Sequence, residues 1–215
     1  MARVASVSIV SVIAVLVFSS MTAAAAVSSA ITDPVGDARW VSPSQAGPQS
    51  ERIPAYQDIA AASVSKEGST FTFSMEMAGA IPDAPSLSPN GVKLDVWVWP
   101  VIPDLSFSAC GDPIAPGHCF NGQFDVRVHW DGTSFSAFLL DRRPLATGGE
   151  AVYSPVPFSI QGGEIRVFVD AAAIGDPTSF YWLALTADWL SPHFETSASK
   201  YLDFAPDGEN PIWPS

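Results

Sequence analysis

A period-two alternation of apolar and polar residues runs through most of the chain from Asp58 onward, and it restricts the fold more than any other feature. In the segment TFTFSMEM, one face carries Phe71, Phe73, Met75 and Met77. Strands place successive side chains on opposite faces, so this pattern indicates strands with one buried side. No long amphipathic helix pattern interrupts it. We therefore predict an all-β fold, an antiparallel two-sheet β-sandwich of immunoglobulin-like or jelly-roll-like type with about nine strands.

Short turn motifs are expected to connect these strands. The motifs KEGS, DG and QGG, which begin at positions 66, 131 and 161, predict three hairpins. In DAAAIGDP, Asp170 is expected to cap a single helical turn that Pro177 stops. The strand VKLDVWVWP should end at Pro100 and Pro103, because proline cannot donate to a sheet ladder. SFYWLALTADW predicts a nearly continuous apolar strand in the middle of a sheet.

The N-terminal segment is typical of an export signal. Arg3 precedes the apolar run SVSIVSVIAVLVF and the small-residue stretch TAAAA, so we expect residues 1–26 to be removed after Ala26. The remaining residues 27–215 have the length of one β-rich domain. Removing Arg3 lowers the formal charge of −12 by one unit, and such a surface repels nucleic acid and anionic lipid. We expect a secreted, extracellular protein with no nucleic-acid partner and no membrane insertion. The sequence does not indicate an oligomeric state.

The two cysteines, Cys110 and Cys119, bracket the Pro/Gly-rich loop GDPIAPGH. In an exported chain such a pair predicts a disulfide bond. The competing interpretation is a metal site that also uses His118. That interpretation lacks a clear fourth ligand.

Three segments, ITDPVGD, QDIAAASVSKEGSTFTFSMEMAG and YLDFAPDG, occur in this order and together resemble the DOMON-like β-sandwich superfamily. This superfamily includes carbohydrate-binding modules and the C-terminal modules of glucodextranase-type enzymes. The segment IRVFVDAAAIGDPTSFYWLALTAD is similar to its late strand, turn and strand. The resemblance implies a secreted or surface-attached binding module, and many relatives carry calcium. Some members bind haem b through Met and His, and Met75 or Met77 with His129 or His193 could supply those ligands.

The motif DPVGD suggests a metal site. Pro34 and Gly36 favour a tight turn that brings the carboxylates of Asp33 and Asp37 together, and two such groups repel unless a cation or a donor compensates them. Calcium takes six to eight oxygen ligands. The residues predicted to hold a structural Ca²⁺ are Asp33, Asp37, Asp58 and Asp203, the last two because they stand in segments that match the family pattern. The alternative is ordinary turn chemistry, in which Asp side chains bond their own backbone with no ion.

The strand VKLDVWVWP raises a second hypothesis. Trp97 and Trp99 lie two residues apart, about 6.5 to 7 Å along the strand, which approaches the spacing of successive sugars. If this face is exposed, the indoles would stack on pyranose rings, and Asp95 and Lys93 would bond hydroxyl groups. The alternative is that loops from 101 to 122 or 141 to 155 cover the face and bury both rings.

Recognised catalytic motifs are absent from the sequence, including GxSxG, HExxH, the P-loop and GxGxxG. Paired carboxylates for glycoside hydrolysis, such as Asp95 and Asp125, could meet only in the folded chain. We therefore expect no enzyme. The predicted function is a secreted non-catalytic binding module that recognises a polysaccharide or cell-surface glycan. The alternative is an extracellular structural or protein-interaction protein with no sugar ligand.

Overall fold

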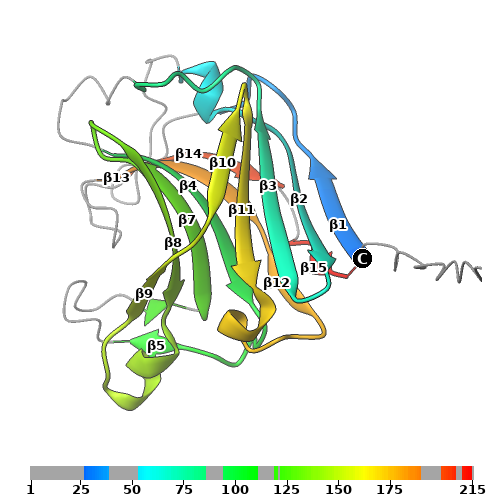
Figure 1. Ribbon diagram of the computed structural model, residues 1–215, viewed down its shortest axis with the longest axis vertical. Coiled ribbons are helices and arrows are strands. Elements are labelled where there is room, and N and C mark those ends of the chain that lie inside the picture. Colours follow the sequence, from blue (N-terminus) through cyan, green and yellow to red (C-terminus); the bar gives the residue numbers. More distant parts are fainter. Residues whose placement is uncertain are drawn as a thin grey trace, which may run out of the picture.

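Two antiparallel β-sheets packed face to face form the protein (Figure 1). The structure is a computed structural model that describes residues 27–38, 53–85, 94–110, 119–120, 122–189, 200–206 and 210–214. It confirms the predicted all-β sandwich. The predicted signal segment, residues 1–26, lies outside the described residues. None of the helices in the described ranges has the length and apolar character needed to cross a membrane.

The first sheet has five strands. In spatial order they are β1 (Val27–Thr32), β2 (Ile59–Glu67), β3 (Thr70–Met77), β11 (Glu164–Asp170) and β10 (Phe158–Gln161). The hairpins β2–β3 and β10–β11 are the ones that KEGS and QGG predict, and Gly68 and Gly162 take the positive φ that their tight turns require. The two hairpins meet where β3 pairs with β11.

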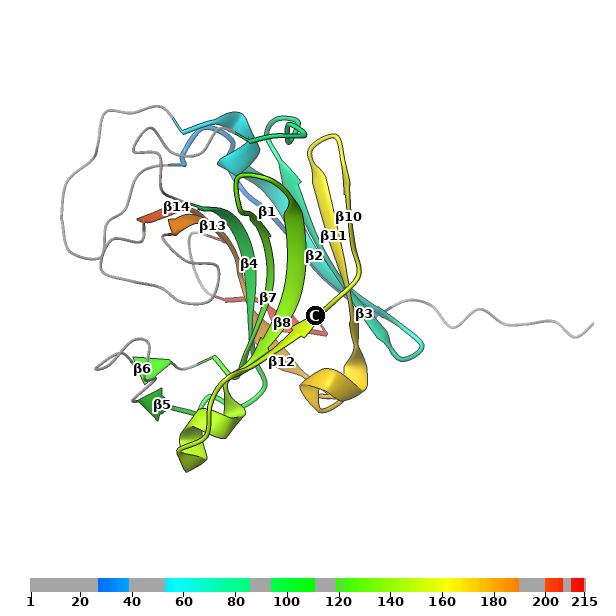
Figure 2. The same ribbon diagram turned by 60° about the vertical axis from the view of Figure 1, so that its left-hand side comes forward.

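The second sheet has eight strands. Its main path is β14 (Lys200–Ala205), β13 (Ala184–Trp189), β4 (Leu94–Ile102), β7 (Phe124–Trp130), β8 (Phe135–Asp141) and β9 (Val152–Pro155). Two short strands, β12 (Phe180–Trp182) and β15 (Ile212–Trp213), extend it beside the end of β4. The small pair β5 (Ala109–Cys110) and β6 (Cys119–Phe120) stands apart from both sheets (Figure 2).

The described chain has fifteen strands, more than the nine expected. Strands β5, β6, β9, β12 and β15 have two to four residues each, too few to show an alternating pattern. Three short 3₁₀ helices are also present: η1 (Ala55–Gln57), η2 (Arg143–Thr147) and η3 (Ala171–Ile174). In η3, the Asp170 carboxylate accepts a hydrogen bond from the Ala172 amide at 3.0 Å, so the predicted cap is confirmed.

The main core fills the space between the sheets. It contains the inward faces of β3 and β11 from one sheet and of β4 and β7 from the other. Phe71, Phe73 and Met75 have no exposed surface and Met77 is 5 % exposed, which confirms the buried face predicted for β3. A smaller apolar cluster lies on the outer face of the second sheet and includes Val96, Val98, Leu185 and Ala187.

Strand β4 runs through Pro100 and ends before Pro103, so the prediction that Pro100 ends it was wrong. The reason lies in its neighbours. On one side Pro100 pairs with Asp125 of β7. On the other side β13 pairs only as far as Val98, and β12 begins to pair at Val101. Pro100 therefore stands at the break between β13 and β12, where a missing amide proton interrupts no ladder. The same break divides SFYWLALTADW, predicted as one strand, into two.

The backbones of β5 and β6 place Cys110 directly opposite Cys119. Directly opposite residues of an antiparallel pair have Cα atoms about 4.5 to 5.5 Å apart, within the range that a disulfide needs. The structure describes the backbone of these two cysteines but not their side chains. The bond stays a prediction. His118, the third residue of the alternative metal site, lies outside the described residues.

Candidate functional site

Three of the four predicted metal ligands come together at one place in the fold. The carboxylates of Asp33, Asp37 and Asp203 each offer an oxygen atom, and these oxygens lie within 4.8 Å of one another. Asp33 and Asp37 belong to the turn that follows β1, whereas Asp203 belongs to β14 in the other sheet. Oδ2 of Asp33 and Oδ1 of Asp37 are shielded from solvent. We call this group the carboxylate cluster.

The DPVGD turn is fixed against β2 by hydrogen bonds. The Asp33 amide donates to the Ala60 carbonyl at 2.9 Å. Gly36 has a φ of +93°, a conformation that strongly favours glycine, and its amide donates to both carboxylate oxygens of Asp58 at 2.8 and 3.2 Å. Asp58 therefore holds the turn in place and is not one of the three clustered residues. This long-range bond differs from the local bonding of Asp side chains to their own backbone that the sequence left open as an alternative to a metal.

Asp203 connects the two sheets. Its Oδ2 accepts a hydrogen bond from the Ile59 amide of β2 at 2.6 Å, and its Oδ1 accepts one from the Phe204 amide at 2.9 Å. Thr186 of β13 pairs with Asp203, but the next residue pairs with Tyr201, so β14 has one extra residue here. Such a bulge redirects the side chains around it. The bulge in β14 thus lies next to Asp203, the residue through which this strand reaches the carboxylate cluster.

The electrostatics of Asp203 differ from those of an ordinary aspartate. Burial raises its pKa, the hydrogen bond from the Ile59 amide lowers it, and the negative charges of Asp33 and Asp37 raise it, with a net result of about 7. An aspartate normally titrates near 3.9. Without a cation, the cluster therefore holds a proton at pH values where a free aspartate has lost it. A divalent cation would take the place of that proton and favour the ionised form.

Sequence reasoning missed Gln57, a polar residue of η1 that is fully buried. Its backbone carbonyl accepts a hydrogen bond from Thr186 Oγ1 at 2.6 Å, and Thr186 is the strand partner of Asp203. This bond links η1 to the strand that pairs with Asp203. The available signal was its place immediately before Asp58, where a polar pair enters an apolar strand.

The prediction that Trp97 and Trp99 form an exposed platform was wrong. Both indoles have no exposed surface and belong to the core between the sheets. Trp97 Nε1 donates to the Tyr56 carbonyl at 3.2 Å, and Trp99 Nε1 donates to the Ser74 carbonyl at 3.4 Å. These partners come from η1 and β3, so the opposite sheet and not a loop covers the rings. Because Val96 and Val98 are also buried, β4 is buried on both faces.

The polar residues assigned to that platform do not support it. Lys93 and the side chain of Asp95 lie outside the described residues. The backbone register pairs Asp95 with Trp130 and Asp125 with Pro100, at opposite ends of β4, so these two acids do not form a catalytic pair. Asp125 is instead buried on the outer face of the sheet.

Asp125 is held by two arginines. The Arg142 guanidinium donates to its two oxygens at 2.8 and 2.6 Å, and Arg127 donates to Oδ2, with Nε at 3.0 Å. Burial raises the pKa of Asp125, but the positive charges of Arg142 and Arg127 outweigh it and lower the pKa to about 2. The group stays ionised and serves to join β7 to the chain that leaves β8.

The predicted haem ligands lie on different sides of the second sheet. Met75 and Met77 project into the core, whereas His129 lies on the outer face, where its ring contacts Phe138 edge to face at 5.6 Å. One haem could not reach both. His193 lies outside the described residues. Nε2 of His129 lies 3.1 Å from Ser136 Oγ. The nearby Asp131 carboxylate is engaged in the hairpin turn, where it accepts hydrogen bonds from the amides of Thr133 and Ser134.

Comparison of the chain with protein-family models, with curated proteins and with solved structures finds no match. The DOMON-like resemblance therefore stays a prediction that rests on the three sequence segments.

Proposed function

We propose that this chain is a secreted, non-catalytic binding module of the cell exterior, in which a structural Ca²⁺ ties the two sheets together. The observation that carries the calcium assignment is the meeting of Asp33, Asp37 and Asp203 from opposite sheets. Three carboxylates in so small a volume repel one another unless a cation or a bound proton compensates them. Calcium prefers carboxylate, carbonyl and water oxygens. Further oxygen ligands, from backbone carbonyls or water, would supplement the three acids.

Calcium titration of the chelated protein tests the ion. We expect calorimetric uptake of one Ca²⁺ per chain and a higher unfolding temperature in its presence. Asp203→Asn removes one ligand charge and should weaken uptake strongly. The matched control is Asp83→Asn, because Asp83 is exposed and lies outside the cluster. If the chelated wild type takes up no calcium, the cluster is a hydrogen-bonded joint without an ion.

The proposed binding function rests on the predicted export signal, the resemblance to binding modules and the exposed outer face of the five-stranded sheet. In this proposal the module recognises a polysaccharide or cell-envelope glycan. The purified mature protein should be depleted from solution by one member of a panel of insoluble polysaccharides, and soluble fragments of the same polymer should compete. This assay does not depend on the calcium result, so each part can fail alone.

The second candidate function is an extracellular structural or protein-interaction protein with no sugar ligand. The burial of Trp97 and Trp99 favours it, because it removes the aromatic platform from which the glycan hypothesis first came. Failure of every polysaccharide to deplete the protein would select this candidate.

A further inference from the structure

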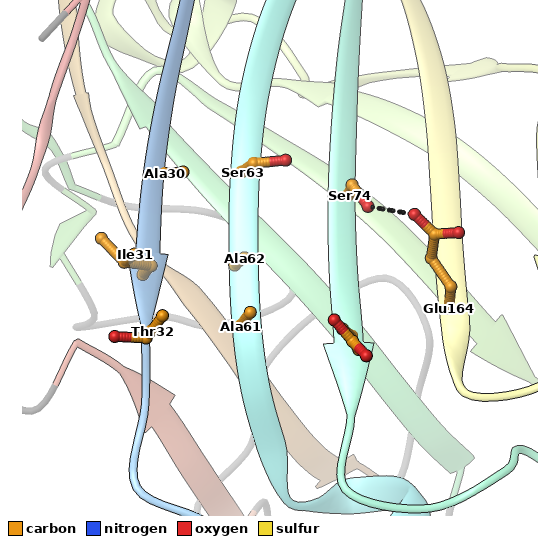
Figure 3. Close-up of a pocket in the computed structure, with 9 residues that line it drawn as sticks. Ala30, Ile31, Thr32, Ala61, Ala62, Ser63, Ser74 and Glu164 are labelled. Atoms are coloured by element: carbon orange, nitrogen blue, oxygen red, sulfur yellow. Dashed lines mark hydrogen bonds between the residues drawn. The ribbon is translucent and has the colours of Figure 1, made fainter.

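The outer face of the five-stranded sheet carries a hollow of about 390 Å³ (Figure 3). Its lining comes from four adjacent strands and consists of Ala30, Ile31, Thr32, Ala61, Ala62, Ser63, Ser74, Glu76 and Glu164. Alanine and serine are small, so the middle of the sheet is covered only thinly, while longer side chains stand at one end. The hollow follows directly from this choice of outward-facing residues.

A second hollow of about 390 Å³ continues over the ends of β3 and β11. It shares Glu76 and Glu164 with the first, so these two residues border both hollows, which we together call the trough. Backbone makes up much of its lining. A Cβ on Gly163 would lie 3.0 Å from the Gly79 carbonyl oxygen and 3.1 Å from that of Met77, so glycine permits the close packing at this end.

The strand register places the polar groups of the trough in rows. Thr32, Ala61, Glu76 and Glu164 are successive cross-strand partners. Neighbouring strands lie about 4.8 Å apart, so this row is roughly 14 Å long. The next row along the strands contains Ala30, Ser63, Ser74 and Arg166. A chain that crosses the strands would meet hydroxyls, methyl groups and carboxylates in turn.

Two like charges face each other in the trough. Glu76 stands directly opposite Glu164, and directly opposite like charges destabilise a strand pair. Glu164 accepts hydrogen bonds from Ser74 Oγ at 3.0 Å and Arg166 Nε at 2.7 Å, and the bond from Arg166 lowers its pKa. Glu76 is exposed, and none of the ion pairs found among the described residues includes it. The trough therefore favours a ligand with positive charge.

We infer that this trough binds a glycan whose sugar units carry free amino groups, with an ammonium group at Glu76 and sugar hydroxyls at Ser63, Ser74 and Thr32. The methyl groups of Ala30 and Ala61 would lie under the apolar C–H face of a sugar ring. A polycationic glycan also complements the net charge of −12, which disfavours acidic polysaccharides. This inference rests on the proposed glycan-binding function and replaces the tryptophan strand with a different face.

Calorimetric titration with short glucosamine oligomers tests the inference, with fully N-acetylated oligomers of the same length as the comparison. The amino oligomers should bind, and the acetylated ones should bind about tenfold more weakly, because they lack the charge-assisted hydrogen bond. Raising the ionic strength to about 1 M, where the screening length is about 3 Å, should weaken the binding of the amino oligomers.

Two variants locate the site. Glu76→Gln should lower affinity about tenfold, whereas Glu150→Gln, the same change at an exposed residue outside the trough, should leave it unchanged. Ala30→Ile occupies part of the hollow without a change of charge or an added aromatic ring and suits an edge strand, so it should weaken binding with unfolding unchanged.

Three results would overturn the inference: equal binding of acetylated and amino oligomers, equal effects of the two glutamine variants, or equal affinity for oligolysine, which would show charge attraction alone. If glucosamine oligomers fail but another polysaccharide depletes the protein, the ligand assignment fails and the proposed function stands. If no polysaccharide binds, both fail.

Discussion

The carboxylate of Asp203 should make the stability of the calcium-free protein fall as pH rises from about 4 to about 8. Its pKa in the folded protein is about 7, mainly because of burial, with a further increase from Asp33 and Asp37. In the unfolded chain it should titrate near 3.9. Between these values the folded protein binds a proton that the unfolded chain has lost, so folding becomes less favourable as pH rises. The contribution is complete below pH 4 and lost above about 7.

The size of the effect on stability follows from the shift in the pKa of Asp203. A change of about three pKa units corresponds to on the order of 4 kcal/mol, at 1.36 kcal/mol per unit. This is a large part of the 5 to 15 kcal/mol that stabilises a typical domain. Asp125 and Asp131 have pKa values of about 2, so their contributions change only in more acidic solution. The histidines also titrate between pH 4 and 8, so Asp203 is isolated by the difference between wild type and Asp203→Asn over this interval.

Urea unfolding of the chelated protein at several pH values measures this directly. Asp203 should contribute to wild type a downward slope of at most about 1.4 kcal/mol per pH unit, the limit for one proton. Asp203→Asn should remove most of that slope, and Asp83→Asn should retain it. Saturating calcium should reverse the trend in wild type, because metal binds ionised carboxylates. Equal slopes for the chelated wild type and chelated Asp203→Asn would refute the reasoning.

Three further outcomes are expected. Trp99→Ala should lower the free energy of unfolding by about 3 to 5 kcal/mol in urea titrations, because the fully buried indole leaves a cavity in the core. Asp125→Asn should cost about 3 to 5 kcal/mol, because two buried guanidinium groups lose their counter-charge, whereas Asp141→Asn should cost less than about 1 kcal/mol, since its partner Arg143 is exposed. Mass spectrometry after alkylation should show no modification of Cys110 or Cys119 until a reductant is added, and reduction should cost roughly 2 to 3 kcal/mol.

The sequence predicted the fold where one face of a strand was clearly apolar. The alternation in β3 identified its buried side because Thr72, Ser74 and Glu76 occupy the other face. In β4 the same method could not assign the interior, since valines fill one face and tryptophans the other, and both are buried. A period-two pattern shows that side chains alternate between two faces. When a strand is covered on both sides, the pattern does not show which face points to the core between the sheets.

Part of the proposed metal site could likewise be predicted from local sequence, and part could not. DPVGD is local, so its turn could be predicted from Pro34 and Gly36. The approach of Asp203 depends on the packing of β14 against the start of β2, a contact between residues 144 apart in the sequence. No local pattern contains that information. The sequence did not predict the trough, because Glu164 reaches Glu76 only through the pairing of β3 with β11.

That pairing also has a consequence for how the chain folds. The hairpins β2–β3 and β10–β11 each close over a short turn, which takes microseconds in isolated hairpins. Their junction joins segments such as those around Ser74 and Glu164, 90 residues apart, so it requires the closure of a long loop. Proteins rich in such contacts fold in milliseconds to seconds. Until the junction forms, β3 and β11 each present an unpaired strand edge, and a folding chain is then most open to pairing with another copy of itself.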